Sequence, residues 1–419
     1  MRNLLLLFLG CILFADEIPA KFKDPRNCIA CHKDQVLQWQ TSLHAISHED
    51  KNELYKKAVE FSAIDSHKSF EEMLVTCGTS QFVIKQLLIN LHKTFEDTVV
   101  ACGTCHNPRL EIKSVGSEFI IAKEFLGSNA KEVKEVNDAI SAKHVKTGIS
   151  CYICHNADSV KQNHSDTKSG YDALNFVTDD TIVGPFESND RAGYHKTDKR
   201  EHFISGNDLC LACHQGFGSA NKFSLYEMRN EFQSSKSSDR CVDCHMKFSK
   251  NEIIAPTINK TTAVARDIKD HQFSGVRNDP ELLESAMEIS LDKREKALVI
   301  KNLIPHRLPS GFSGRSIVVD VDYGENLKEF NERFEIRAKY FDFKSDETLS
   351  YTAQNLVFDT RLKPLEVRKI PLKVPQKTEK INLEINYYVL DPNLAKKLEI
   401  KDEQFLKPYL ILKKEYICL

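Results

Sequence analysis

Five Cys-x-x-Cys-His motifs occur in this chain of 419 residues, and they constrain its fold more than any other feature. Two thiols at this spacing can reach the two vinyl groups of one porphyrin, and the next side chain can direct an imidazole at the iron. Each motif therefore predicts one covalently attached haem c with a proximal histidine ligand. The predicted attachment residues are Cys28, Cys31, Cys102, Cys105, Cys151, Cys154, Cys210, Cys213, Cys241 and Cys244. The predicted proximal ligands are His32, His106, His155, His214 and His245.

The cysteine count favours five haem c groups over other cysteine-based sites. Of the 13 cysteines, ten lie in the motifs, and only Cys11, Cys77 and Cys418 remain. A structural zinc site does not require a histidine after every Cys-x-x-Cys pair, and a disulfide framework is typical of short secreted chains. The segment around Cys77 is similar to the one around Cys102 but lacks the second cysteine and the histidine. We interpret that similarity as chance.

The first fifteen residues are typical of an export signal. Arg2 precedes an apolar run that is too short to span a membrane, and the small Ala15 precedes a polar stretch. We expect residues 1–15 to be removed and the mature protein to lie in the periplasm, where c-type haem is attached. Leu9-Gly10-Cys11 also resembles a lipobox, but Phe8 and the apolar residues after Cys11 argue against lipidation.

The charge balance excludes one large class of partners. The formal net charge is −2, which leaves no electrostatic footprint for a nucleic acid. No segment after the export signal is long and apolar enough to cross a bilayer. We therefore expect redox proteins as partners, and only peripheral contact with a membrane unless Cys11 is lipidated.

The composition changes near residue 290, which predicts two domains. Residues 16–291 contain all five motifs and 14 of the 15 histidines, whereas residues 292–419 contain only His306. We predict that the first part is a pentahaem domain, mostly helical or irregular, in which haem replaces much of the apolar core. Apolar residues at helical spacing in Asp279–Leu291 predict a helix that bridges the two parts.

The second part has the pattern of β-strands. Runs rich in Val, Ile, Tyr and Phe are separated by polar stretches and by stretches with Pro or Gly. Their number and length predict an immunoglobulin-like β-sandwich over residues 292–419, so the predicted fold class is α+β. The predicted strands are Ala297–Ile304, Ser316–Asp322, Phe334–Phe341, Leu349–Phe358, Glu366–Val374, Lys380–Val389 and Tyr409–Ile417.

Ten histidines lie outside the motifs, and five irons need at most five of them as sixth ligands. His144 continues an apolar stripe at helical spacing that is formed by Val133, Val136 and Ile140. His44 and His92 end similar stripes. A histidine on a buried helix face can instead be a core residue that hydrogen-bonds a carbonyl group. The ten are His44, His48, His67, His92, His144, His164, His195, His202, His271 and His306.

Further segments around the motifs carry a family signature. They are Trp39-x-x-Ser42-x-His44, Gly184-Pro185-Phe186 with the later His195, Met246 after the last motif, Asp270–Gly275 and His306–Gly311. Together they resemble cytochrome c554-like multihaem proteins that have a C-terminal β-domain. The resemblance covers most of residues 28–375. It implies that His44, His144, His271 and His306 are distal iron ligands, and that His195 or His202 completes the set.

These features predict electron transfer rather than catalysis. We interpret the chain as a periplasmic cytochrome between a quinol-linked donor, such as a membrane quinol-oxidising cytochrome, and a terminal acceptor. One alternative is a reductase that acts on a small nitrogen or sulfur oxyanion at an open haem, although no Cys-x-x-Cys-Lys motif is present. A third possibility is a binding module whose β-domain docks a partner.

Overall fold

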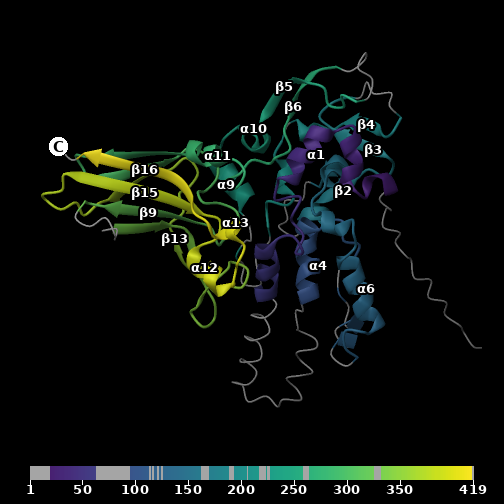
Figure 1. The fold of residues 1–419 in the computed structure, drawn as a ribbon, viewed down its shortest axis with the longest axis horizontal. Coiled ribbons are helices and arrows are strands. Elements are labelled where there is room, and N and C mark those ends of the chain that lie inside the picture. The colour runs from purple at the N-terminus through teal and green to yellow at the C-terminus, as the bar shows by residue number, and fades with distance from the viewer. Residues whose placement is uncertain are drawn as a thin grey trace, which may run out of the picture.

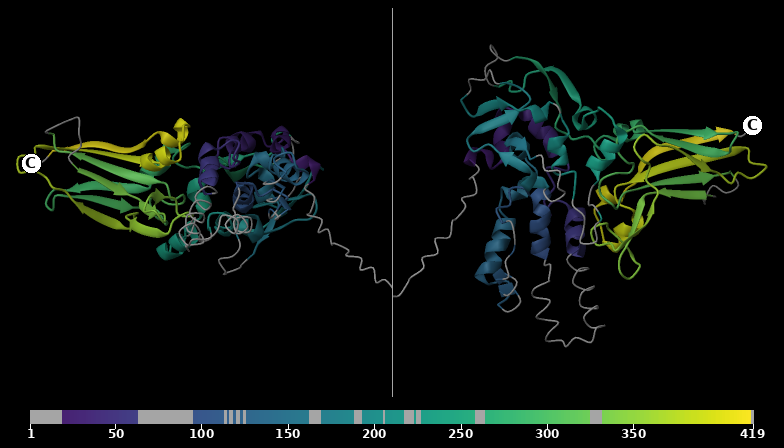
Figure 2. Two further views of the ribbon diagram at one scale, coloured as in Figure 1. Left: turned by 90° about the horizontal axis from the view of Figure 1, so that it is seen from below. Right: turned by 180° about the vertical axis from the view of Figure 1, so that it is seen from behind.

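The computed structural model describes two parts of the chain that lie side by side, a haem-motif part and a β-domain (Figures 1 and 2). The residues that it describes are 19–62, 95–112, 115, 118–119, 122–123, 126–161, 169–187, 193–204, 206–216, 223, 227–257, 264–324 and 332–417. Within those ranges, no helix has the length and apolar character to cross a membrane. The export signal and the predictions about Cys11, Cys77, Cys418, His67, His92 and His164 lie outside them.

The haem-motif part consists of short helices joined by irregular segments. The first motif runs from the 3-10 helix η2 (Pro25–Ala30) to the start of α1 (Lys33–Gln40). The second motif ends α4 (Phe95–His106). The third is α7 (Cys151–His155) and the fifth is α10 (Cys241–His245), while the fourth begins in α8 (Asp208–Leu211). Other helices of this part are η1 (Ala20–Phe22), α6 (Lys131–Ile140), η3 (Val145–Thr147), η4 (Gly170–Ala173), η5 (Glu201–Phe203) and α9 (Met228–Ser235).

Helical geometry explains how each motif can hold one haem. Residues three and four apart lie on the same face of a helical turn, so two cysteines and the histidine after the second face the same way. The turn is closed by a hydrogen bond from the His32 N–H to the Cys28 carbonyl oxygen at 2.8 Å. The equivalent bond from His214 to Cys210 measures 2.9 Å.

Three small two-stranded sheets complete the haem-motif part. The strands β3 (Thr181–Gly184) and β4 (Lys196–Lys199) run parallel. The other two sheets are antiparallel and pair β1 (Ala157–Val160) with β2 (Leu174–Phe176), and β5 (Phe248–Glu252) with β6 (Arg266–Lys269). The prediction of a mostly helical or irregular region is therefore confirmed with these short additions.

The β-domain is built from three antiparallel sheets. Their strand orders are β10-β9-β15-β16, β14-β8-β7 and β12-β11-β13. The first two orders match those of the C′-C-F-G and A-B-E strands of an immunoglobulin sandwich, which confirms the predicted class. The strands are β7 (Met287–Asp292), β8 (Ala297–Asn302), β9 (Ser316–Asp322), β10 (Glu332–Ile336), β11 (Ala338–Phe341), β12 (Glu347–Thr348), β13 (Asn355–Asp359), β14 (Val367–Pro371), β15 (Lys380–Tyr388) and β16 (Tyr409–Ile417).

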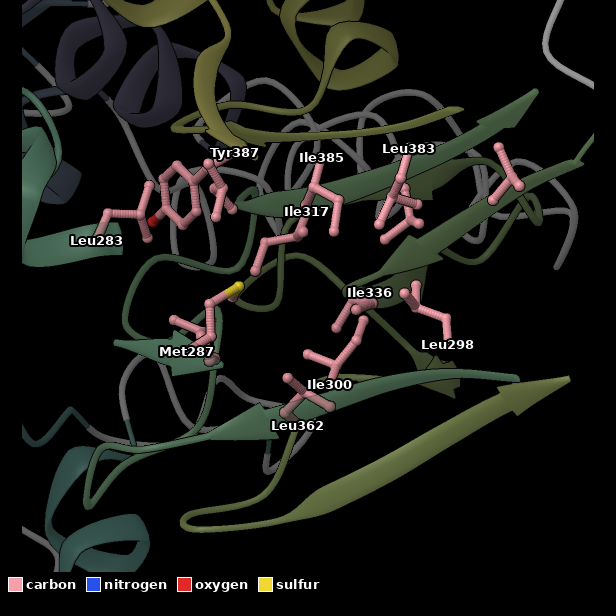
Figure 3. Packing of buried hydrophobic residues seen from close by; sticks show 14 of the residues in the cluster. Leu283, Met287, Leu298, Ile300, Ile317, Ile336, Leu362, Leu383, Ile385 and Tyr387 are labelled. Atoms are coloured by element: carbon pink, nitrogen blue, oxygen red, sulfur yellow. The ribbon is translucent and has the colours of Figure 1, made fainter. Parts of the chain in front are cut away.

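The core of the β-domain lies between two of these sheets. Leu298 and Ile300 of β8 pack toward Ile317 of β9 and toward Leu383 and Ile385 of β15 (Figure 3). All five side chains are almost fully buried. Since the inward residues alternate along each strand, the period of two in the sequence is the direct cause of this packing.

Three predicted elements differ from those of the structure. The helix predicted over Asp279–Leu291 is only α11 (Pro280–Ser285), because Met287–Asp292 alternates apolar and polar residues and pairs with β8 as a strand. The run Leu349–Phe358 is mostly a turn, with a strand only from Asn355. The predicted strand Phe334–Phe341 is divided at the buried Arg337, where the chain passes from one sheet to another.

The two parts share a second apolar cluster. Leu54 and Ala58, from the helical segment 53–62, pack against Leu390, Leu394 and Phe405 of the β-domain. These residues come from around α12 (Pro392–Lys397) and α13 (Glu403–Leu406). The cluster fixes the β-domain against the helical segment 53–62, whose Tyr55 and Val59 pack in turn with Val99 and Val100 of α4.

Candidate haem-binding site

One large cavity brings all five motifs together. Its volume is about 2480 Å³, and it is lined by the two cysteines and the histidine of every motif. A pocket for a single small ligand has about 300–1,000 Å³, so this cavity has room for several large groups. Phe248, Val264 and Phe343 line it and are more than half exposed to solvent. A porphyrin, whose two faces are apolar, would cover such side chains.

The chemistry of the buried Cys154 fits a thioether better than a thiolate ligand. Burial raises the pKa of the Cys154 thiol to about 11. A buried sulfur is therefore favoured in its neutral form. Structural zinc requires deprotonated cysteines, whereas a thioether carries no charge. Among the described residues, no group of three or more His, Cys, Asp or Glu side chains is arranged to hold a free metal ion.

The proximal histidines are oriented by backbone carbonyl groups. Nδ1 of His155 donates to the Val183 oxygen at 2.7 Å, and Nδ1 of His245 donates to the Ser274 oxygen at 2.7 Å. Nδ1 of His32 donates to the Ile254 oxygen at 3.1 Å. A donor bond at Nδ1 leaves the lone pair of Nε2 available for a metal and fixes the plane of the ring. This is the arrangement that an iron ligand requires.

Four of the proximal histidines face a second histidine from a distant segment. The ring centres lie 6.3 Å apart for His32 and His195, 6.2 Å for His214 and His44, 6.1 Å for His155 and His271, and 6.4 Å for His245 and His306. Two metal–nitrogen bonds of about 2 Å each, with the ring radii added, give about 6 Å between ring centres. Each pair is therefore spaced as two axial ligands of one iron would be.

Three of the four facing histidines are held in the neutral form that iron binds. Burial lowers the pKa of His44 to about 3 and the pKa of His306 to about 4. Burial likewise lowers the pKa of His271 to about 4. A protonated imidazole has no lone pair to give, so the desolvation of these rings removes the competing proton at neutral pH.

Comparisons with known proteins agree with this geometry. Residues 27–107 match the family model described as cytochrome c554 and c-prime, and residues 202–250 match the model of a doubled CXXCH motif. Among solved structures, the chain is similar to the penta-heme cytochrome c552 from Thermochromatium tepidum. The TM-score is 0.63 and the identity is 16% over 93% of this chain and 97% of that chain, a likeness of fold. No curated protein sequence matches the chain.

The doubled-motif match covers the fourth and fifth motifs, and the cytochrome c554 match covers the first two. The two matched segments together hold four of the five motifs, and the cavity brings all five motifs together. The chain is a multihaem c-type cytochrome. The segment Trp39-x-x-Ser42-x-His44, which carried part of the family resemblance, lies within the first match.

The structure separates the predicted distal candidates of this cytochrome. His44, His195, His271 and His306 line the cavity and face a motif histidine. His202 also lines the cavity, but its ring lies against Phe203, and its buried Nε2 has no hydrogen-bond partner among the described residues. Of the two alternatives that the sequence left open, His195 is the one opposite a proximal histidine.

His144, which the sequence nominated as a distal ligand, is not among the residues that line the cavity. The helix α6 ends at Ile140, four residues earlier, so His144 is not on its buried stripe. The ring is partly exposed, and its Nε2 lies 3.8 Å from Oε1 of Glu111. The stripe itself is real, because Val133 and Ile140 are buried, but it stops where the helix stops.

His106 is the proximal histidine whose surroundings differ. Its Nδ1 donates to the Ser47 oxygen at 3.3 Å, much as in the first, third and fifth motifs. The Tyr55 ring stacks on the His106 ring, with 4.0 Å between the ring centres and an interplanar angle of 3°. Among the residues that the structure describes, no histidine ring is recorded opposite His106.

Contacts between cysteines give the order in which the motifs neighbour each other. The side chains of Cys28 and Cys151 are close neighbours, as are those of Cys210 and Cys241. Cys105 is likewise next to Cys213, and the buried Cys154 lies near the cysteines of the fourth motif. The first motif is thus next to the third, the third is next to the fourth, and the fourth is next to the second and the fifth.

Proposed function

We propose that this cytochrome binds five haem c groups and transfers electrons in the periplasm between a quinol-linked donor and a terminal acceptor. Bound haem supplies the one-electron iron couple. The residues of the chain fix the spacing, the axial ligands and the burial of each iron. The single observation that carries the proposal is the set of four facing histidine pairs in one cavity.

The facing pairs support a specific assignment of distal ligands. We propose His195 for the first motif, His271 for the third, His44 for the fourth and His306 for the fifth. An iron with two histidine ligands has no position for a substrate, and its coordination does not change between oxidation states. Such sites favour electron passage over chemical turnover.

The motif neighbours support a branched electron route. The path would run from the first motif to the third and the fourth, with branches from the fourth to the second and the fifth. Cys244 of the fifth motif is exposed, whereas the nine other described cysteines are partly buried. We therefore propose that a redox partner exchanges electrons at the fifth motif, and that a membrane quinol-oxidising cytochrome is one such partner.

A carbon monoxide titration of the fully reduced protein tests the proposal. Six-coordinate haems bind carbon monoxide poorly, so the four paired sites should stay unliganded. The mass of the mature protein should exceed that of its polypeptide by five haems, and low-temperature EPR of the oxidised form should be dominated by low-spin signals. Stoichiometric carbon monoxide binding at two or more haems would contradict the four pairs.

The alternative function is a reductase of a small nitrogen or sulfur oxyanion, and one observation favours it. Among the described residues, His106 alone of the proximal histidines has no recorded facing histidine. An open iron at the second motif would bind one equivalent of carbon monoxide and give a high-spin EPR signal. Steady turnover of nitrite, hydroxylamine, sulfite or tetrathionate together with that signal would favour the reductase over the carrier.

A further inference from the structure

A buried carboxylate lies where the haem-motif part meets the loop that carries His306. Glu231 is in the middle of α9, which lies between the fourth and fifth motifs (Figure 1). It is only 4% exposed, although the helix is mostly polar and its residues Asn230, Gln233 and Ser234 are exposed. Burying a carboxylate is costly unless it is paired and hydrogen-bonded. The partners of Glu231 therefore indicate what it does.

The partners belong to the β-domain and follow His306 closely in the chain. Oε2 of Glu231 accepts a hydrogen bond from the backbone N–H of Arg307 at 3.0 Å, and a second one from the Ser310 hydroxyl at 2.5 Å. Arg307 directly follows His306, and Ser310 is four residues later. The Glu231 carboxylate thus holds the backbone of the loop at Arg307, the residue next to His306.

Two guanidinium groups balance the buried charge. Oε1 of Glu231 lies 3.8 Å from Nε of Arg307 and 3.8 Å from Nη1 of Arg361. Both arginines also pair with Asp359, at 2.9 Å and 2.8 Å. On the other side of the loop, the buried Asn302 donates from its Nδ2 to the His306 oxygen at 2.8 Å. The loop is therefore fixed from α9 on one side and from β8 on the other.

We propose that Glu231 is a positioning residue that holds His306 opposite His245, so that the sixth ligand of the fifth haem depends on the docking of α9 against the β-domain. This inference rests on the proposed ligation by His306. Because the fifth motif has the exposed Cys244, Glu231 would control the coordination of the haem at which a partner exchanges electrons. The sequence of α9 gives no signal for this role, since a glutamate in a polar helix is usually a solvated residue.

The test compares four variants by carbon monoxide stoichiometry and EPR spin state. His306→Ala removes the ligand and should add one equivalent of carbon monoxide to the wild-type value. Glu231→Ala should raise the carbon monoxide affinity of that same haem at least tenfold, with covalent haem unchanged. Ser310→Ala removes one of the two hydrogen bonds and should show a smaller rise. The matched control is Glu227→Ala, in the same helix segment, which lies 4.0 Å from Arg361 with a side chain that is 40% exposed; it should behave as wild type.

The outcomes separate the positioning role of Glu231 from the assignment of His306 as a ligand. If His306→Ala opens a haem while Glu231→Ala and Ser310→Ala both match the wild type, the positioning role is overturned and the proposed function stands. If His306→Ala adds no carbon monoxide binding, His306 is not a ligand, and the positioning role of Glu231 is overturned as well. A uniform loss of thermal stability without any change in spin state would make Glu231 a structural ion-pair partner only, which also overturns the proposal. Glu231→Gln, which keeps the shape of the side chain, covers the case in which the alanine variant does not fold.

Discussion

The two parts of this cytochrome bury apolar surface in different ways. In the β-domain, one continuous core of 19 buried side chains lies between facing sheets and the segments next to them, and it includes Leu298, Ile317 and Leu383. Among the described residues of the haem-motif part, the clusters are small, and one of them has seven buried members such as Val99 and Ile140. There the remaining apolar side chains line the cavity instead of packing on each other. The core of the β-domain is filled by its own side chains, whereas the haem-motif part surrounds a cavity that has room for haem groups.

This difference has a thermodynamic consequence. Burial of apolar surface contributes about 25 cal/mol per Å², and it must offset a large loss of conformational entropy. A cavity of about 2480 Å³ lacks the contacts that would provide this stabilisation. We therefore expect the folding of the haem-motif part to depend on haem, and the folding of the β-domain to be independent of it.

The largest expected effect comes from withholding haem. Protein produced without haem attachment should lose the structure of its haem-motif part while the β-domain stays folded. Limited proteolysis should then leave a resistant fragment that begins near Met287, where β7 starts, and mass spectrometry identifies its ends. Complete digestion of both parts at the same rate would show that the β-domain also requires haem, and the contrast between the parts would be wrong.

Much of this contrast could be predicted from the sequence, because its causes are local. The Cys-x-x-Cys-His spacing fits one helical turn whatever surrounds it. The strands Ser316–Asp322 and Tyr409–Ile417 have the predicted bounds, because both are rich in the β-branched and aromatic residues that favour strands. The strand Met287–Asp292 was missed because apolar positions in a short segment can satisfy both a helical and a strand period.

The pairing of histidines is not a local property. His271 faces His155 and His306 faces His245 only because distant segments meet in the folded chain. The sequence could therefore nominate ligands but not match them to motifs. His144 shows the same limit, since its helical spacing was correct up to Ile140 and the end of the helix then directed it elsewhere. Glu231 has no sequence signal, because its burial depends on the β-domain.

The next effect is a test of core packing in the β-domain. Leu383 is 2% exposed in the sandwich core (Figure 3). Leu383→Ala should cost about 2–5 kcal/mol of unfolding free energy, from lost burial and the residual cavity. Urea unfolding followed by far-UV circular dichroism should report this loss, while the Soret band of the native protein stays the same. An equal shift of the Soret transition would mean that the two parts unfold as one unit.

A pair of histidine variants sharpens the description of the haem-motif part. His271→Ala removes a ring that faces His155 at 6.1 Å, so it should convert one low-spin haem to a form that binds carbon monoxide. His144→Ala, outside the cavity, should leave the EPR spectrum unchanged. Covalent haem should remain complete in both variants. A high-spin signal in His144→Ala would mean that this histidine reaches an iron after all.

The smallest expected effect concerns an ion pair at the entrance to the first motif. Asp24 caps η2, and its carboxylate pairs with the Arg26 guanidinium at 2.6 Å. The side-chain hydrogen bond from Arg26 lowers the pKa of Asp24 from 3.8 to about 2. Because the folded pKa is the lower one, the stabilisation is fully present above about pH 4, and it is lost as the pH falls toward 2. Asp24→Asn keeps the cap but removes the charge, so at pH 7 it should cost about 0.2–1 kcal/mol, as is typical of a partly exposed pair.

Soret-monitored unfolding at pH 7 and near pH 3 measures this difference between Asp24→Asn and the wild type. The difference in unfolding free energy between the two proteins should be smaller at the lower pH. It should also be smaller in high salt, because the Arg26 guanidinium is exposed. The β-domain transition should not move, since Asp24 contacts only the haem-motif part through Arg26 and Lys143. A gap that stays constant from pH 7 to pH 3 would assign the effect to the cap rather than to the charge. A shift of the β-domain transition would show that even a surface contact at the first motif is felt across the boundary between the two parts.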